Sequence, residues 1–308
     1  MTSSHKNITA RIVSSFIPRG AEAKPQSPAG NPAGVVLDAD GLTDSDMLAI
    51  AGKIGLSETA FVSASKTEGF KLDFFTPTRR IAHCGHATIA AFSYLAEHGR
   101  VEDGVTSKET IDGPRKIVIQ NGEAYMEQLA PSYQTSEAWT ERNVSIADVL
   151  ASLGLAEADL AAGAAPIVVN TGNRFMIVGV KSAAALRALH PDQQAIERIS
   201  EALDLIGYYV FTQDVADNHH DASTRMFAPR YGIPEESATG MAAGPLACFL
   251  RDKLDLPKTD LLIAQGQFME TPSPSEIKVA LEVGDDGAIR GLMAGGRGRV
   301  TREVTIVI

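Results

Sequence analysis

Two similar motifs, far apart along the chain, each open an alanine-rich stretch with the periodicity of a helix. The motifs are Cys84-Gly85-His86-Ala87-Thr88 and Ser237-Ala238-Thr239-Gly240-Met241. Apolar residues follow on one helical face, at Ile89, Phe92, Leu95 and Ala96 after the first motif and at Leu246, Phe249 and Leu250 after the second. This internal similarity constrains the fold, because it indicates two similar halves, each containing a largely buried helix.

Strand-like segments occur in both halves, so the sequence predicts a mixed protein of helices and strands. A chain of 308 residues also exceeds the roughly 100–200 residues of a typical domain, which favours two domains. The polar segment 131–142 lacks periodicity, and we expect the chain to cross between domains there. The predicted strands are Arg11–Phe16, Gly34–Leu37, Thr59–Val62, Lys71–Thr76, Lys116–Gln120 and Ala124–Gln128 in the first half, and Ile167–Asn170, Phe175–Val180, Tyr208–Thr212, Thr224–Phe227, Leu261–Ala264 and Ile277–Val283 in the second.

Capping residues predict two further helices. One begins after Thr43 and ends at Gly55, and the other begins at Ser145 and ends at Gly154. The exit of the first helix leads directly to Glu58.

The charge of the chain excludes several classes of partner. Acidic residues outnumber basic ones by 38 to 28, the formal net charge is −10, and no block of Lys or Arg concentrates positive potential. Nucleic acid and anionic membrane surfaces are therefore not expected as partners. The N-terminus has no apolar signal core, and no uncharged stretch reaches the roughly 18–20 apolar residues that span a bilayer, so we expect a cytoplasmic protein.

Glu58 is the charged residue whose position best suits acid/base chemistry. It stands between a helix end and the apolar strand Thr59–Val62. Partial burial disfavours the charged form of a carboxyl group, which suits a group that takes up and returns a proton. A glutamate before a strand is more often solvated or a capping residue, so position alone leaves both readings open.

The two glycine-opened helix starts are candidate anion sites. Gly85 and Gly240 let the backbone approach a ligand closely, and the first N–H groups of a helix lack internal partners and carry partial positive charge. Together they could hold a carboxylate. The alternative is that both are ordinary glycine-rich helix starts packed in a core.

His86 and Cys84 could take part in proton transfer at the first helix start. The positive end of a helix favours a neutral imidazole, which can accept or donate a hydrogen bond, although His86 could also be a packing residue. The same environment lowers the pKa of a thiol, so a thiolate base at Cys84 is physically possible. A two-thiol racemase needs a second cysteine at the matching point, where Ser237 stands, and Cys248 lies inside the second helix as a small buried hydrophobe.

The sequence gives little evidence for a metal site or a nucleotide site. No recognised ligand spacing links His83, Cys84 and His86 with the pair His219-His220, and two cysteines cannot build a disulfide framework or a four-cysteine zinc site. The glycine-rich run 295–298 leads into the strand-like segment 304–308 instead of a helix, and it lacks the ending of a phosphate loop. We therefore expect no metal or nucleotide site at these residues.

Six motifs, in order along the chain, resemble the phenazine-biosynthesis PhzF-like family. They are Gly30-Asn31-Pro32-Ala33-Gly34-Val35, Leu56-Ser57-Glu58-Thr59-Ala60-Phe61-Val62, Phe75-Thr76-Pro77, Cys84-Gly85-His86-Ala87-Thr88, Gly232-Ile233-Pro234-Glu235-Glu236-Ser237-Ala238-Thr239-Gly240 and Gln265-Gly266. The resemblance implies an α+β fold of two similar diaminopimelate-epimerase-like domains, each a sheet wrapped around a central helix, with the active site in a cleft between them. It implies domains at 1–132 and 133–299, a C-terminal strand 300–308 that returns to the first domain, and a homodimer.

The same resemblance implies the chemistry. The characterised family reaction is the isomerisation of trans-2,3-dihydro-3-hydroxyanthranilate, in which a glutamate that matches Glu58 moves a proton between carbons without metal or organic cofactor. The matching histidine is His86. An aspartate and a serine that hold substrate in the family align with Glu236 and Met241, and Ser237 stands where proline is usual. These departures bear on which substrate is bound.

The leading hypothesis is a cofactor-independent isomerase that acts on a small carboxylate, with Glu58 as the proton carrier and His86 and Glu236 orienting the substrate. The predicted substrate-binding residues are Asn31, Cys84, Gly85, Thr239, Gly240 and Met241. Two alternatives stay open: an epimerase, racemase or dehydratase that uses Cys84 as a base, and a metabolite-binding relative without catalysis. The segment 19–29 is longer than usual for the family and could reshape the entrance of the site.

Overall fold

The chain divides into two compact units, which are described here one at a time. A computed structural model describes residues 6–21, 28–217 and 219–308. Unit 1 comprises residues 1–127 and 295–308, and unit 2 comprises residues 128–294. The predicted boundaries, after residues 132 and 299, lie a few residues further along the chain. Within the described ranges, no helix is long and apolar enough to cross a membrane.

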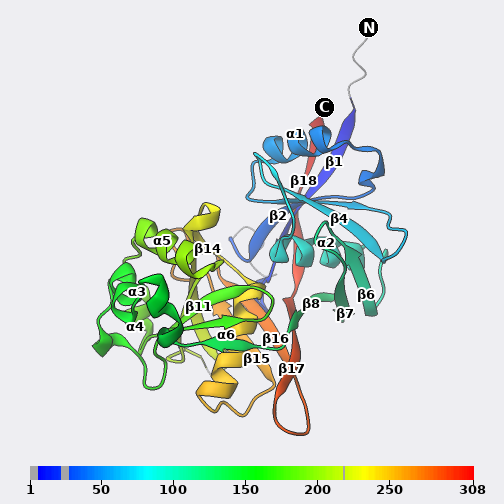
Figure 1. Ribbon diagram of the computed structural model, residues 1–308. Helices are drawn as coiled ribbons and strands as arrows, with labels where there is room; N and C mark the ends of the chain where they lie inside the picture. The colour runs from blue at the N-terminus through cyan, green and yellow to red at the C-terminus, as the bar shows by residue number, and fades with distance from the viewer. Residues whose placement is uncertain (1–5, 22–27, 218) are drawn as a thin grey trace. The chain divides into compact units, whose positions relative to one another are not determined.

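Unit 1 is a mostly antiparallel sheet packed around the helix α2. The helix is buried from Gly85 to Leu95 and packs against β1, β2, β3 and β18. Figure 1 labels α2 among the strands of this unit. The strands are β1 (Asn7–Ser15), β2 (Asn31–Val36), β3 (Thr59–Ser63), β4 (Phe70–Phe75), β5 (Arg80–Ile81), β6 (Gly104–Glu109), β7 (Arg115–Gln120), β8 (Glu123–Leu129, which continues into unit 2) and β18 (Gly298–Val307). The helices are η2 (Ala39–Gly41), α1 (Asp44–Ile54) and α2 (Gly85–Glu97).

The last strand of the chain completes unit 1. Strand β18 runs antiparallel to β1 along its whole length, from the pair Asn7 and Val307 to the pair Ser15 and Gly298. Strand β2 pairs with the opposite edge of β1. The first strand of the chain therefore lies between the second strand and the last.

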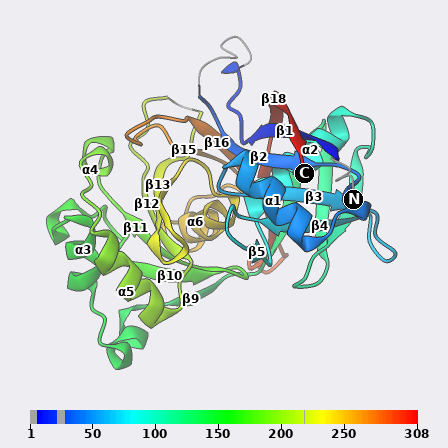
Figure 2. The ribbon, with the colours of Figure 1, turned by 90° about the horizontal axis from the view of Figure 1, so that it is seen from above.

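Unit 2 repeats the design around the helix α6, which lies within a ring of strands in Figure 2. Its residues Gly240 and Ala242 to Leu250 are buried. The strands are β9 (Ser132–Gln134), β10 (Ile167–Asn170), β11 (Arg174–Gly179), β12 (Gly207–Thr212), β13 (Ala222–Ala228), β14 (Ile233–Glu236), β15 (Asp260–Gln265), β16 (Ser275–Val283) and β17 (Ile289–Gly296, which continues into unit 1). The helices are η3 (Ser136–Arg142), α3 (Ile146–Leu153), η4 (Glu157–Asp159), α4 (Ala183–Arg187), α5 (Gln193–Leu203), η5 (Pro229–Tyr231) and α6 (Gly240–Lys253).

The strands of the two units pair in the same order of directions. In unit 1, β1–β2 is antiparallel, β2–β3 parallel, β3–β4 and β4–β5 antiparallel, β4–β6 parallel and β6–β7 antiparallel. In unit 2 the same series runs through β10–β11, β11–β12, β12–β13, β13–β14, β13–β15 and β15–β16. Helices α2 and α6 occupy the same place in the two series. The predicted repeat of two similar halves, each with a buried central helix, is confirmed.

Local signals set the ends of the helices as expected. Thr43 and Asp46 form a reciprocal capping box at the start of α1, and Gly55 ends that helix in the left-handed region at φ 71°. Ser145 and Gly154 do the same for α3. These caps explain why the chain leaves α1 directly before Glu58.

Several parts of the structure differ from the sequence-based expectation or lie beyond it. The segment 131–142, expected to link the domains, lies wholly in unit 2, where Trp139 is buried in the hydrophobic core. Strand β6 was not predicted, because its residues Gly104–Glu109 are mostly polar and only partly buried. Residues 22–27 of the segment 19–29 lie outside the described residues, so its predicted effect on the site stays a prediction.

Candidate functional site

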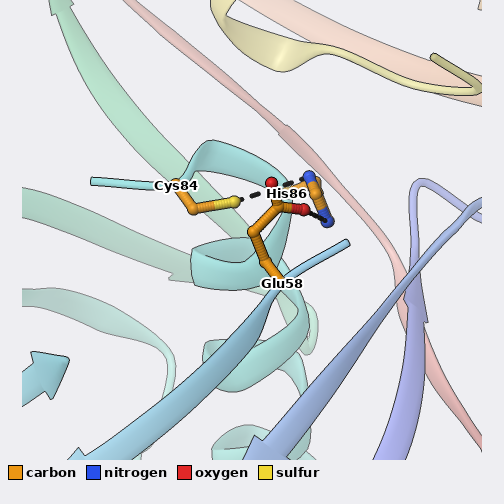
Figure 3. A group of neighbouring side chains, drawn as sticks. All are labelled: Glu58, Cys84 and His86. Atoms are coloured by element: carbon orange, nitrogen blue, oxygen red, sulfur yellow. Dashed lines mark hydrogen bonds and ion pairs between the residues drawn. The ribbon is translucent and has the colours of Figure 1, made fainter. Parts of the chain in front are cut away.

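Three side chains predicted from two separate motifs meet in unit 1, as Figure 3 shows. Glu58 comes directly before β3, and its backbone oxygen accepts a hydrogen bond from the N–H of Gly34 at 3.0 Å. Cys84 is the extended N-cap residue of α2, and His86 lies in the first turn of that helix. Nε2 of His86 lies 3.3 Å from Oε2 of Glu58, and Nδ1 of His86 lies 3.5 Å from the Sγ atom of Cys84. The imidazole thus bridges the carboxyl and the thiol.

The carboxyl group of Glu58 is held out of water. Glu58 is 8% exposed and His86 is 5% exposed. Oε2 of Glu58 is buried and accepts no well-aligned hydrogen bond from any described residue, although Nε2 of His86 lies 3.3 Å away. A buried carboxylate oxygen without a hydrogen bond is costly, and such groups cluster where a ligand or a reaction uses them. This oxygen is therefore available to a substrate atom.

The thiol of Cys84 differs from the sequence-based expectation. The helix start was expected to lower its pKa, but burial raises the pKa of Cys84, and the nearby charge of Glu58 acts in the same direction. The contact with His86 opposes this shift without reversing it. Desolvation wins because a buried thiolate loses its hydration, whereas a helix end supplies only partial charge.

The start of α6 in unit 2 shows which residue matches Cys84. Thr239 is the extended N-cap residue and Gly240 the first helical residue, as Cys84 and Gly85 are for α2. The expected match with Ser237 is therefore wrong, because the chain takes two more residues to reach the helix. A threonine hydroxyl is far less acidic than a thiol, so a second sulfur base is still missing at the corrected position.

Glu236 and Thr239 contact each other directly, and both also contact the buried side chain of Gln265. Thr239 Oγ1 donates to Oε2 of Glu236 at 3.1 Å. The Oε1 atom of Gln265 accepts from the N–H of Thr239 at 3.1 Å and from the hydroxyl of Tyr209 at 2.9 Å, and its Nε2 donates to the backbone oxygen of Glu236 at 2.7 Å. This network fixes the loop that leads into α6. Gln265 was not predicted as a site residue, although the Gln265-Gly266 motif after an apolar strand was the available signal.

The other predicted residues have separate surroundings. Asn31 is the buried first residue of β2, and its backbone oxygen accepts from Ser15. Met241 is partly buried, with its sulfur 3.4 Å from Nδ2 of Asn173. Glu235, the neighbour of Glu236, makes a bidentate contact with Arg225 and so has a structural role.

The histidines considered for a metal do not gather as one site. His83 contacts Lys108 at 3.0 Å, whereas His220 in unit 2 contacts Asp217. In the described part of the chain, only Glu58, Cys84 and His86 bring three ligand-type atoms within 4.8 Å of one another. These are the same groups that the sequence suggested for proton transfer.

Comparison with known proteins identifies the family. The pattern of the phenazine biosynthesis-like protein family PhzC-PhzF matches residues 24–300. A trans-2,3-dihydro-3-hydroxyanthranilate isomerase of Pseudomonas aeruginosa is 31% identical over 270 residues, which cover 84% of this chain and 91% of that protein. Other curated relatives carry the name uncharacterised isomerase.

Solved structures agree with this assignment. The crystal structure of a PhzF-family protein of Bacillus anthracis matches with a TM-score of 0.84 and 26% identity, over 98% of this chain and 100% of that one. A hydroxyproline epimerase of Agrobacterium vitis matches with a TM-score of 0.54 and 13% identity, over 100% of this chain and 94% of that one, which shows a shared epimerase-like fold alone. The chain therefore belongs to the phenazine biosynthesis-like protein family and is an isomerase.

Proposed function

We propose that this isomerase moves a proton between two carbon atoms of a small unsaturated carboxylate, with Glu58 as the proton carrier. The observation that carries the proposal is the buried Oε2 atom of Glu58, which accepts no well-aligned hydrogen bond from the described residues and lies 3.3 Å from His86. A base that works on carbon must be within reach of the proton and must not be solvated by water. The burial of Glu58, which is 8% exposed, supports the second condition.

The proposed reaction needs no net oxidation or reduction. The Glu58 carboxylate removes a proton from one carbon, and the electron pair of the broken C–H bond moves into the adjacent double-bond system. The carboxylic acid of Glu58, whose proton exchanges with solvent between the two steps, then protonates another carbon of that system, where a new C–H bond forms. Trans-2,3-dihydro-3-hydroxyanthranilate, named for a relative, is a substrate of this class.

His86 and the start of α2 would hold the substrate during this transfer. His86 contacts Glu58 through one ring nitrogen and the Cys84 thiol through the other, so its ring orientation is defined. The N–H of Gly85 is the first of α2 and can receive an anionic group of the substrate. Roles for Glu236, Thr239 and Met241 in orienting the substrate stay predictions of the resemblance.

Deuterium uptake tests the proton carrier directly. Trans-2,3-dihydro-3-hydroxyanthranilate is incubated with the protein in deuterated buffer, and site-specific exchange is followed by NMR. We expect Glu58→Gln to lower the exchange rate by a factor of about 10²–10⁴, the usual contribution of general acid/base catalysis. Glu97→Gln, at the exposed end of α2, should leave the rate unchanged.

Two results of this experiment would overturn the proposal. Exchange at the wild-type rate in Glu58→Gln would remove Glu58 from the mechanism. Tight binding of the compound by the wild type without any exchange or conversion would instead favour a metabolite-binding protein.

The proposal also assigns Glu58, Cys84 and His86 to proton transfer instead of metal binding. Dialysis against EDTA should therefore leave the exchange rate unchanged. A loss of exchange that Zn²⁺ restores would show that the three residues hold a metal. The homodimer and the cytoplasmic location stay predictions, and sedimentation of the purified protein tests the first of them.

A further inference from the structure

A lysine side chain is completely buried behind the start of α2. Lys108, on strand β6, is 0% exposed. Its Nζ atom lies 3.0 Å from Nδ1 of His83, 2.5 Å from Oγ1 of Thr88 and 4.9 Å from the centre of the Phe74 ring. Among the described residues it has no carboxylate partner. A buried lysine without a counter-ion destabilises the fold and therefore calls for a functional explanation.

Lys108 is connected to the first peptide group of α2. Its ammonium group donates to the hydroxyl of Thr88, and that hydroxyl donates to the backbone oxygen of Cys84 at 2.6 Å. The carbonyl of Cys84 and the N–H of Gly85 belong to the same peptide group. A hydrogen bond to a peptide carbonyl polarises the N–H at its other end, by roughly 10–30% for each bond in a chain. The charge of Lys108 thus reaches the N–H of Gly85.

We propose that Lys108 is a positioning residue that acts through Thr88 to strengthen anion binding at the N–H of Gly85. The inference rests on the proposed function, because the anion is taken to be the carboxylate of the substrate. It adds a new element, a cation that does not touch the substrate but sets the potential at the site where its carboxylate binds.

The surroundings of Lys108 determine how its effect depends on pH. Burial, aided by the charge of Arg115, lowers the pKa of Lys108 to about 7, while Cys84 acts in the opposite direction. Burial and the charge of Lys108 hold the pKa of His83 well below its usual range, so His83 is neutral and its Nδ1 atom can accept from the ammonium group. His83, Cys84 and Arg115 are the titratable groups that face Lys108, and Phe74 covers it from β4. Anion affinity should therefore fall as the pH rises through about 7 and Lys108 loses its proton.

The hydrogen bonds that lead from Lys108 through Thr88 to the backbone oxygen of Cys84 form a relay. Helix α6 of unit 2 has no equivalent of this relay among its described residues. Counted from the first helical residue, Ala243 of α6 stands where Thr88 stands in α2. The loop before α6 is instead held by the uncharged amide of Gln265. The relay is therefore a property of the helix start that carries Cys84 and His86, and it does not follow from the repeated fold.

Binding of two related aromatic compounds tests the inference. The probes are 3-hydroxyanthranilate, which carries a carboxylate, and 2-aminophenol, which has the same substituents without it. A unit charge acting across roughly 10 Å at an effective dielectric constant of about 20 changes affinity on the order of tenfold. At pH 6 we expect Lys108→Met to weaken the binding of 3-hydroxyanthranilate by about this factor and to leave the affinity for 2-aminophenol unchanged.

The Thr88 variants separate the relay from simple packing. Thr88→Val keeps the shape but removes the hydroxyl, and it should weaken binding of the carboxylate in the same direction as Lys108→Met. Thr88→Ser keeps the hydroxyl and should bind as the wild type does. Should Lys108→Met fail to fold, this pair still decides the question.

Proton uptake supplies a readout that a purely structural role would not move. A bound anion favours the charged form of Lys108, so wild-type protein at pH 7.5 should take up protons when 3-hydroxyanthranilate binds. Calorimetry in buffers of different ionisation enthalpy measures this uptake, which should be lost in Lys108→Met. Equal effects of Lys108→Met on both probes, or unchanged proton uptake, would overturn the inference. The Glu58→Gln exchange experiment is independent of these outcomes, so failure of the proposed function is recognised separately.

Discussion

At the scale of single residues, the surroundings decide which of three acidic or basic groups can carry a proton. The thiol of Cys84 and the carboxyl of Glu58 both contact His86. Burial raises the pKa of Cys84, so the thiol stays protonated at neutral pH and is a poor base. The site is therefore built around a carboxyl group, although a cysteine lies beside it.

Replacing Cys84 tests this order of importance. We expect Cys84→Ala to lower the rate of deuterium exchange by less than about tenfold, because the thiol supports the orientation of His86 without accepting the proton, whereas general acid/base groups contribute about 10²–10⁴. Cys248→Ala, which alters a cysteine buried in unit 2, is the control. Loss of exchange in Cys84→Ala together with full activity in Glu58→Gln would establish the alternative epimerase mechanism.

At the scale of elements, the repeated fold contains two similar helix starts, those of α2 and α6. The candidate acid/base groups lie only beside the start of α2. The position before β3 holds Glu58, whereas the position before β12 holds Ile206. Counted from the helix start, His86 in α2 corresponds to Met241 in α6. The proposed acid/base groups thus lie in unit 1, and the corresponding turn of unit 2 is held by hydrogen bonds around Gln265.

Gly266 shows how tightly the backbone closes that turn. Its φ angle is +80°, and a Cβ atom there would lie 2.2 Å from the backbone oxygen of Ser273 and 2.7 Å from that of Ser237. Gly287 has nearly the same φ, +82°, with nothing within 4 Å. We expect Gly287→Ala to lower the free energy of unfolding by roughly 1–2 kcal/mol and Gly266→Ala by roughly 2–5 kcal/mol, because only the second adds overpacking to the backbone strain. Urea unfolding measures both, and equal losses would contradict the steric reason.

At the scale of the whole molecule, the net charge of the chain and the charge of Lys108, buried in unit 1, have opposite signs. The chain has a net charge of −10, yet it buries one cation, Lys108, without a carboxylate partner among the described residues. An anionic surface repels anionic ligands at long range. The buried lysine then supplies a positive potential only where the substrate anion binds, at a cost in stability.

The pH dependence of unfolding should reveal that cost. An unfolded lysine has its usual pKa of 10.5, whereas burial lowers that of folded Lys108 to about 7. Between these values the unfolded chain binds the extra proton, so the stability contributed by Lys108 rises with pH in this window. We expect Lys108→Met to be more stable than the wild type by a few kcal/mol at pH 7, with the gap narrowing by about 1.4 kcal/mol per pH unit towards pH 10. Urea unfolding at pH 7, 8.5 and 9.5 tests this, and a constant gap would contradict the buried charge.

Much of the fold, and the three residues that meet around His86, could be predicted from the sequence. Capping residues predicted α1 and α3, and the repeated glycine motifs predicted the central helices, because these signals are local. Strand β6 and Lys108 were not predicted, because the mostly polar segment 104–109 has no regular alternation of apolar residues and a lysine is rarely buried. The shift in the Cys84 pKa also depended on burial that only the packed structure shows. The correspondence between Cys84 and Thr239 could be recognised only from the observed first residues of α2 and α6.

The pairing of β18 with β1 has a consequence for synthesis on the ribosome. Domains usually fold as they emerge, the N-terminal one first. Here β1 obtains one of its two neighbours only when residues 298–307 have been translated. Until then it presents an unpaired edge, a hazard for aggregation. The order of maturation should therefore be reversed: unit 2 can finish folding during translation, and the acid/base centre of unit 1 becomes complete last.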